Sequence, residues 1–187
     1  MKLDMIVDLE CTCWPEGYES DKFIRKETIE IGATFLKDGF IVGVFSAFVK
    51  PILLFTKGGT LHEFCTSLTG ITDSDLIDRP LFGESFNNLK NYAKIAVGKD
   101  FCEIKWGSWG HFDYRQLERD LRYCGRGNES LGDHISIKHE FAKRRKIRPC
   151  GMKAALNILD IKLSGNHHRA LDDAMNISRI YAEEWLN

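Results

Sequence analysis

The 187-residue sequence contains no run of about 18 apolar residues, so it predicts no membrane-spanning helix. Its first residues, Met1–Met5, reach an acidic side chain at once and lack the apolar core of a signal peptide. It also has no internal repeat, no low-complexity tract and no clear linker. With 43% hydrophobic residues it is not a disordered chain, and a single domain spanning residues 1–187 is expected.

Neither sign of charge dominates, because the sequence has 26 Lys and Arg residues and 27 Asp and Glu residues, for a formal net charge of −1. That balance excludes a globally basic nucleic-acid wrapper and a strongly acidic tail, although it allows a local basic groove. The six cysteines include no C-x-x-C pair, which indicates reduced thiols in a cytoplasmic protein. A zinc site built on Cys11, Cys13 and a distant histidine is the alternative, but the spacing matches no standard zinc motif.

What the sequence does contain is a succession of apolar strands and amphipathic helices. The clearest signal is a hairpin, in which Thr28–Leu36 and Phe40–Val49 flank an Asp38-Gly39 turn and Pro51 ends the second strand. Further strands are expected at residues 5–10 and 101–106, and helices at residues 61–77 (broken at Gly70), 81–97, 112–124, 136–145, 152–159 and 171–186. One α/β domain with a mixed sheet is the simplest account.

Three acidic groups stand at the ends of these elements. Asp8 and Glu10 lie two residues apart on a predicted strand, so both carboxylates emerge on the same face. Such a pair repels itself, and a divalent cation would relieve the repulsion, although two solvated acids at a strand end are an equally good interpretation. Asp113 follows the strand predicted at 101–106, where it would be either a ligand or an acid favoured by a helix dipole. The same two interpretations apply to Asp172 and Asp173 at the last helix.

The segments DLECT at 8–12, WGHFD at 109–113 and HRALDD at 168–173 resemble, in order and spacing, the three motifs of DEDDh-type 3'→5' exonucleases. This family belongs to the RNase T/DnaQ-like superfamily, and the sequence is most similar to its Eri-like and KapD-like branch. The segments TIEIGA at 28–33, FCTSLTGIT at 64–72 and GMKAALNILDI at 151–161 extend the resemblance over nearly the whole chain. It implies a ribonuclease H-like fold, a mixed β-sheet flanked by α-helices.

The resemblance also implies a set of catalytic residues. His168 becomes the general base, because the family's His-x4-Asp spacing selects His168 with Asp173 over their neighbours His167 and Asp172. Two Mg²⁺ or Mn²⁺ ions are implied, since hard ions prefer carboxylate oxygens. Four carboxylates become their ligands: Asp8, Glu10, Asp113 and Asp173.

By the same resemblance, the expected activity is metal-dependent removal of nucleoside 5'-monophosphates from the 3' end of single-stranded DNA or RNA. Two alternatives stay open: a nucleic-acid-binding module with little activity, and an exonuclease subunit of a larger proofreading or defence assembly. No membrane partner is expected, and the sequence leaves self-assembly into a homo-oligomer open.

The sequence indicates the residues that would bind the substrate less clearly than it indicates the metal ligands. The resemblance implies that Glu10 and Thr12 hold the terminal 3'-hydroxyl, while stacking on bases is expected of Trp14, Phe64 and Phe112. Core packing is the alternative for the two phenylalanines. The basic run at 138–148 would contact backbone phosphates or form a solvated helix face. His111 departs from the family's second motif and has no assigned role.

Overall fold

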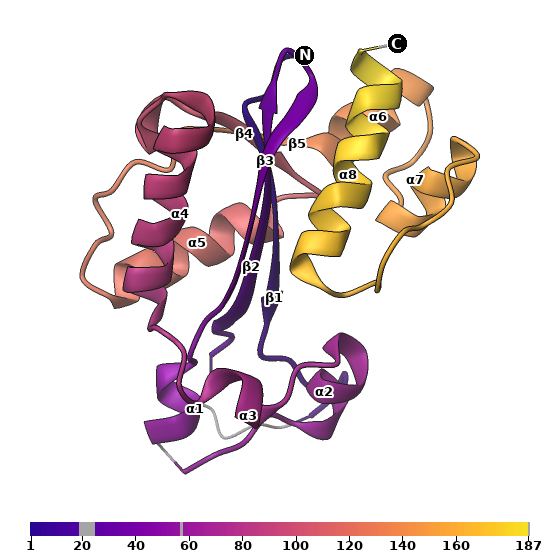
Figure 1. Ribbon diagram of the computed structural model, residues 1–187. Coiled ribbons are helices and arrows are strands. Elements are labelled where there is room, and N and C mark those ends of the chain that lie inside the picture. Colours follow the sequence, from indigo (N-terminus) through magenta and orange to yellow (C-terminus); the bar gives the residue numbers. More distant parts are fainter. Residues whose placement is uncertain (19–24, 57, 187) are drawn as a thin grey trace.

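The computed structural model describes residues 1–18, 25–56 and 58–186, and part of the charged loop after Trp14 lies outside them. One mixed sheet runs through the middle of the molecule, with helices on both faces (Figure 1). Its strands stand in the order β3-β2-β1-β4-β5, with β4 and β5 parallel to β1 and the other pairs antiparallel. The strands are β1 (Met5–Cys11), β2 (Thr28–Lys37), β3 (Phe40–Phe48), β4 (Lys105–Ser108) and β5 (Asp133–Ser136).

The predicted hairpin is confirmed as β2 and β3. Asp38 and Gly39 both have positive φ angles, 50° and 87°, as a two-residue turn between twisted strands requires. The strand predicted at 101–106 is wrong in its first half, where Phe101–Glu103 form a 3₁₀ turn before β4 begins. Strand β5 was not predicted, because a strand of four residues is too short to show an alternating pattern.

The helices follow the predicted segments closely, and the break at Gly70 is confirmed by its left-handed backbone, with a φ of 72°. A short helix directly after Pro51 was not predicted. In Figure 1, α1, α2 and α3 gather at the end of the sheet where β1 ends. The helices are α1 (Ile52–Thr56), α2 (Glu63–Thr69), α3 (Asp73–Leu76), α4 (Phe82–Val97), α5 (Phe112–Tyr123), α6 (Ile137–Arg145), α7 (Met152–Ile158) and α8 (Ala170–Trp185).

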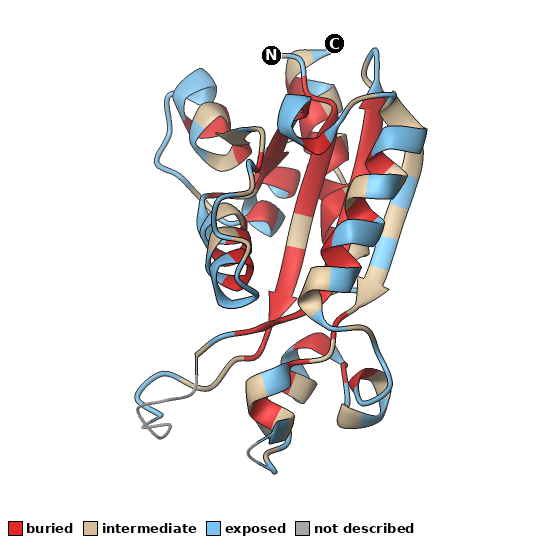
Figure 2. Ribbon diagram, turned by 90° about the vertical axis from the view of Figure 1, so that its left-hand side faces the viewer, coloured by how far each residue is buried: buried red, intermediate tan, exposed pale blue. Residues whose placement is uncertain are grey.

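Two apolar layers pack on the sheet. One joins α4 and α5 to the face that carries Val7 and Leu9, and the other joins α6, α7 and α8 to the face that carries Ile6. Central strand β1 is therefore covered on both sides, and Figure 2 shows it buried apart from one half-buried position. That position is Asp8, on the same face as Ile6 and therefore towards α8.

Two expectations about the whole chain can be compared with the described residues. Within them, no helix is long and apolar enough to cross a membrane. All six cysteines are unpaired.

Candidate active site

Four carboxylates from three separate elements line one cavity of about 340 Å³. Asp8 and Glu10 come from β1, whereas Asp113 and Asp173 come from the first turns of α5 and α8. The structure thus brings together the four acids that the motifs predict as metal ligands. The remaining wall consists of Leu9, Trp109, Phe112, Gly151, Met152, His167, His168 and Ile177.

Three of the four carboxylates are close enough to share a cation. Oxygen atoms of Asp8, Glu10 and Asp173 all lie within 4.8 Å of one another. Asp113 is tied to the same strand, because its Oδ1 accepts a hydrogen bond of 3.1 Å from the backbone N–H of Leu9. Since Leu9 stands between the two acids of β1, this bond sets the position of α5 relative to both of them.

The electrostatics of the cavity also favour a cation. Burial is the main cause that raises the pKa of each acid, to about 8 for Glu10 and to about 6 for Asp113. The pKa of Asp8 is raised well above its usual range by burial and then by the charges of Asp113 and Glu10. The donor atoms are all hard carboxylate oxygens, so Mg²⁺ or Mn²⁺ fits this set better than zinc.

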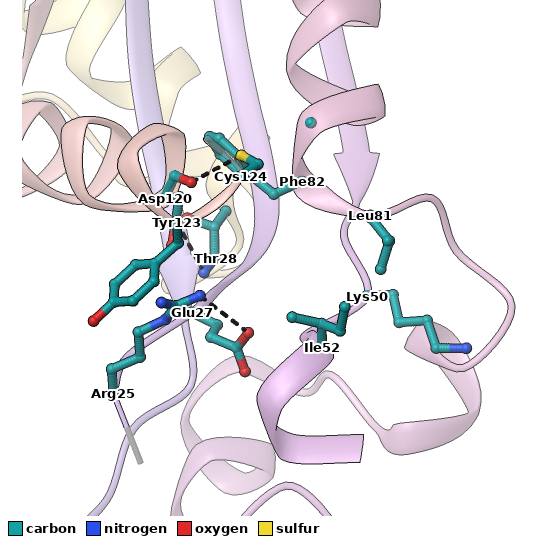
Figure 3. A pocket seen from close by; sticks show the side chains of 11 residues that line it. Arg25, Glu27, Thr28, Lys50, Ile52, Leu81, Phe82, Asp120, Tyr123 and Cys124 are labelled. Atoms are coloured by element: carbon teal, nitrogen blue, oxygen red, sulfur yellow. Dashed lines mark hydrogen bonds and ion pairs between the residues drawn. The ribbon is translucent and has the colours of Figure 1, made fainter. Parts of the chain in front are cut away.

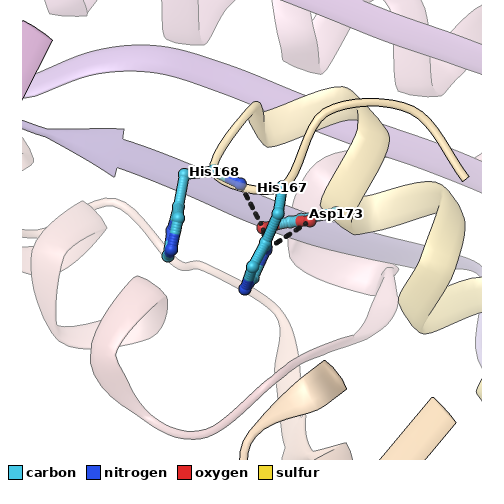
Figure 4. Close-up of side chains that lie close together, drawn as sticks. All are labelled: His167, His168 and Asp173. Atoms are coloured by element: carbon cyan, nitrogen blue, oxygen red, sulfur yellow. Dashed lines mark hydrogen bonds and ion pairs between the residues drawn. The ribbon is translucent and has the colours of Figure 1, made fainter. Parts of the chain in front are cut away.

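His167 and His168 take different places beside Asp173 (Figure 4). Nδ1 of His167 lies 3.0 Å from Oδ2 of Asp173, which also accepts a 3.1 Å hydrogen bond from the backbone N–H of His168. The two imidazoles stack with their centroids 3.9 Å apart. The His168 imidazole makes no hydrogen bond with any described residue, and burial lowers its pKa, which keeps it neutral near pH 7. His168 is therefore the ring that is free to accept a proton.

The predicted substrate contacts are not all at the cavity. Phe112 lines it and is 45% exposed. Thr12 is buried, and its Oγ1 accepts a 2.9 Å hydrogen bond from the backbone N–H of Glu27. Trp14 is half-buried and Phe64 is exposed on α2, but neither lines the cavity.

His111 and the basic run lie outside the cavity as well. The ring of His111 stacks on that of His139, with centroids 5.2 Å apart. In the basic run, Arg144 and Arg145 both pair with the buried carboxylate of Glu184, near the C-terminal end of α8. These two arginines thus anchor α6 to α8. Lys143, Lys146 and Arg148 are exposed as well, and among the described residues no ion pair involves them.

A second cavity, of about 130 Å³, lies between the C-terminal end of α5 and the start of α4 (Figure 3). Its wall includes Arg25, Phe82 and Tyr123, and it contains none of the predicted site residues. Asp120 in this wall accepts a 2.7 Å hydrogen bond from the hydroxyl of Thr28, which ties α5 to β2. The buried acid here therefore has a hydroxyl partner within the fold.

Sequence reasoning missed two charged residues beside the site, Glu30 and Arg169. Glu30 is only 1% exposed, and its carboxylate is bound by the guanidinium of Arg169. TIEIGA at 28–33 served only as a landmark of the resemblance, although an acid within an otherwise apolar strand is itself a signal of a buried partner.

The raised pKa values predict that Mg²⁺ stabilises the protein more at about pH 9 than at about pH 6. Glu10 has a pKa of about 8 in the folded protein and the ordinary value of 4.5 in the unfolded chain. The folded state therefore binds more protons than the unfolded state between these two pH values, and the metal-free protein loses stability as pH rises from 4.5 to about 8. A cation binds the ionised carboxylates and removes this penalty. Melting temperatures with and without Mg²⁺ at the two pH values test this, and equal shifts would contradict it.

Comparison with known proteins agrees with this geometry. A family model described as Exonuclease, of the RNase T type, matches residues 5–181. ERI1 exoribonuclease 2 of Xenopus laevis is 28% identical over 196 residues, which cover 94% of this chain and 27% of that protein. The 3'-5' exonuclease Snipper of Drosophila melanogaster is 26% identical over 191 residues, which cover 93% of this chain and 66% of that protein. The chain thus spans about a quarter of the length of the first relative.

Solved structures show the same architecture. The nuclease domain of 3'hExo, described as a DEDDh family member bound to rAMP, superposes with a TM-score of 0.79 and 25% identity, and the match covers 96% of this chain and 90% of that one. Cell-death related nuclease 4 superposes with a TM-score of 0.74 and 19% identity, over 96% of this chain and 62% of that one. The expected ribonuclease H-like fold, a mixed sheet flanked by helices, is confirmed.

Proposed function

The chain belongs to the RNase T-type exonuclease family, whose model matches residues 5–181, and we propose from this that it is a metal-dependent 3'→5' exonuclease. Its substrates would be single-stranded DNA or RNA with a free 3' end, and its products nucleoside 5'-monophosphates. The observation that carries the proposal is the cavity in which the carboxylates of Asp8, Glu10 and Asp173 converge beside the unbonded imidazole of His168.

Each part of the cavity has a role in phosphodiester hydrolysis. Two Mg²⁺ or Mn²⁺ ions held by the four acids would neutralise charge on the phosphate and stabilise the leaving 3'-oxygen. His168 would take the proton of the attacking water, for which its neutral state at pH 7 is required. Phe112, exposed at the wall of the cavity, would stack on a terminal base, a grip that tolerates any sequence.

A degradation assay tests the proposal. Single-stranded DNA and RNA, each labelled at the 5' end, are incubated with Mg²⁺, Mn²⁺ or EDTA, and a ladder of shortened products is expected with either ion alone. A ladder that persists in EDTA would overturn the metal requirement, and equal activity on a 3'-blocked strand would overturn the polarity. Binding of the strands without any ladder would favour a nucleic-acid-binding module instead.

Replacing His168 by alanine is expected to lower kcat by about 10²-fold at neutral pH, the loss typical of a missing general base. The matched variant His167→Ala removes the neighbouring imidazole, whose Nδ1 lies 3.0 Å from Asp173. We expect it to weaken metal binding more than it lowers kcat at saturating Mg²⁺. A larger fall in kcat for His167→Ala than for His168→Ala would show that the two assignments are reversed.

A further inference from the structure

Glu30 is a fifth carboxylate beside the cavity, on the strand next to the metal-ligand strand. In the antiparallel register Glu10 stands directly opposite Glu30, so their side chains share the face of the sheet that α8 covers. Glu30 does not line the cavity, however, and it is 1% exposed. An ionised group in this place needs a partner of opposite charge.

Both oxygens of Glu30 accept hydrogen bonds from Arg169 and Ala170, at the start of α8. Nη2 of Arg169 donates to Oε1 at 2.9 Å, and Nε of the same guanidinium donates to Oε2 at 3.1 Å. The backbone N–H of Ala170 donates to Oε2 at 3.0 Å. This bidentate arrangement fixes direction as well as distance, and it leaves Glu30 unavailable as a metal ligand.

The same contacts replace the usual cap of α8. Arg169 is the N-cap residue of this helix, but its side chain makes no capping hydrogen bond. The first free N–H of the helix, that of Ala170, is instead satisfied by Glu30 across the sheet. A carboxylate at this end of a helix is also favoured by the helix dipole. The start of α8 is therefore attached to β2 rather than capped by its own sequence.

The two residues assigned to the reaction stand on either side of Arg169. His168 precedes it with a φ of 66°, a left-handed backbone that a residue other than glycine adopts only when its surroundings hold it. One turn later, the N–H of Asp173 donates to the carbonyl of Arg169 at 2.9 Å. The position of Arg169 thus determines where both His168 and Asp173 stand relative to Glu10.

We propose that Glu30 and Arg169 are positioning residues, whose ion pair holds the base and the last metal ligand in register with the carboxylates of β1. The proposal rests on the exonuclease function proposed above. It assigns the pair no contact with substrate or metal. Without Arg169, Glu30 would be an uncompensated charge opposite Glu10, and the first turn of α8 would lose two of its three bonds to β2.

Three variants test the proposal. Arg169→Ala removes the pair, and Arg169→Lys keeps the charge but not the two parallel hydrogen bonds. Lys99→Ala is the matched control, because Lys99 binds both oxygens of the buried Asp4 at 2.7 Å, at the opposite end of β1 from Glu10. Melting temperature, kcat, KM and the dissociation constant for Mn²⁺ are measured for each.

Arg169→Ala is expected to lower kcat by about 10²-fold with little change in KM, the size of effect that a misplacement of about 1 Å produces. Arg169→Lys should recover part of this loss, and Lys99→Ala should lower only the melting temperature. Wild-type kcat in Arg169→Ala, or an equal loss of kcat in Lys99→Ala, would reduce the pair to a general stabilising contact and overturn the proposal.

Binding of Mn²⁺ separates this proposal from the function on which it rests. If the wild-type protein cleaves neither DNA nor RNA, the proposed function fails, but the ion can still be titrated. We expect Arg169→Ala to weaken Mn²⁺ binding by about tenfold or more, as loss of outer support around metal ligands does, and Lys99→Ala to leave it unchanged. Equal Mn²⁺ affinity in the wild type and Arg169→Ala would overturn the positioning role by itself.

Discussion

Replacing Asp8 by asparagine is expected to lower kcat by about 10³-fold or more, because catalytic ions stabilise the transition state by several kcal/mol and about 1.4 kcal/mol is tenfold in rate. Asp8 is one of the three acids whose oxygens lie within 4.8 Å of one another, and the amide removes the charge while keeping the shape. Single-turnover rates on a 5'-labelled strand at saturating Mg²⁺ measure the effect.

The same variant is expected to leave the metal-free protein as stable as the wild type or more so. Asp8 is half-buried beside Asp113 and Glu10, and both its loss of solvation and these charges disfavour its ionised form. Compared with the wild type, Asp8→Asn therefore has a lower melting temperature only in the presence of Mg²⁺. Asp78→Asn, at an exposed position of the loop after α3, is the control and should change neither quantity. Full activity of Asp8→Asn would remove Asp8 from the metal site.

Replacing Gly32 by alanine is expected to disturb both folding and activity. Gly32 stands opposite Asp8 in β2, and a Cβ atom there would lie 2.1 Å from the carbonyl carbon of Ala170 and 2.2 Å from the backbone N of Leu171. Both are backbone atoms, so α8 must move away from the sheet. Overpacking of this kind costs about 3 kcal/mol or more. For a protein of this size that is a fall in melting temperature of roughly 6–12 °C.

Activity should fall further than the folded fraction, because the displaced first turn of α8 carries Asp173. A loss of about 10²-fold in kcat per folded molecule is expected from a shift of about 1 Å. Gly83→Ala is the matched control: a Cβ in α4 would lie 3.4 Å from the end of the Arg126 side chain and 3.9 Å from the Cβ of Cys124, both ordinary contacts, and alanine favours a helix. If Gly32→Ala melted and cleaved like Gly83→Ala, the close approach of α8 to β2 would be disproved.

Local patterns in the sequence account for most of the elements. The β-branched residues and the Asp38-Gly39 turn placed the hairpin correctly, and the two-residue period of a strand put Asp8 and Glu10 on one face. The errors fall where the pattern is short. The strand predicted at 101–106 joined the three residues of the 3₁₀ turn to the first two residues of β4, and β5 was too short to show a period.

The catalytic set was predicted by the resemblance rather than by local chemistry. His168 and Asp173 were chosen over His167 and Asp172 by the family's spacing alone, and the structure now shows the difference between them in their contacts. His167 holds Asp173, whereas Asp172 accepts a 2.7 Å hydrogen bond from the backbone N–H of Asn166 and so supports the loop before α8. Neither contact has a signature in the order of the residues.

The sequence by itself determined most of the strands and helices, their apolar faces and the acids at their ends, because these depend on neighbours within a few positions. Only the tertiary structure decided how those acids meet. Glu30 and Arg169 are 139 positions apart in the sequence. Gly32 has no Cβ atom, which leaves room for the backbone of Ala170, a residue at a similar separation in the sequence. Such contacts arise when strand β2 and helix α8 pack together, and they position His168 and Asp173 against β1. Neither the charge balance nor the composition of the chain predicts these contacts between β2 and α8.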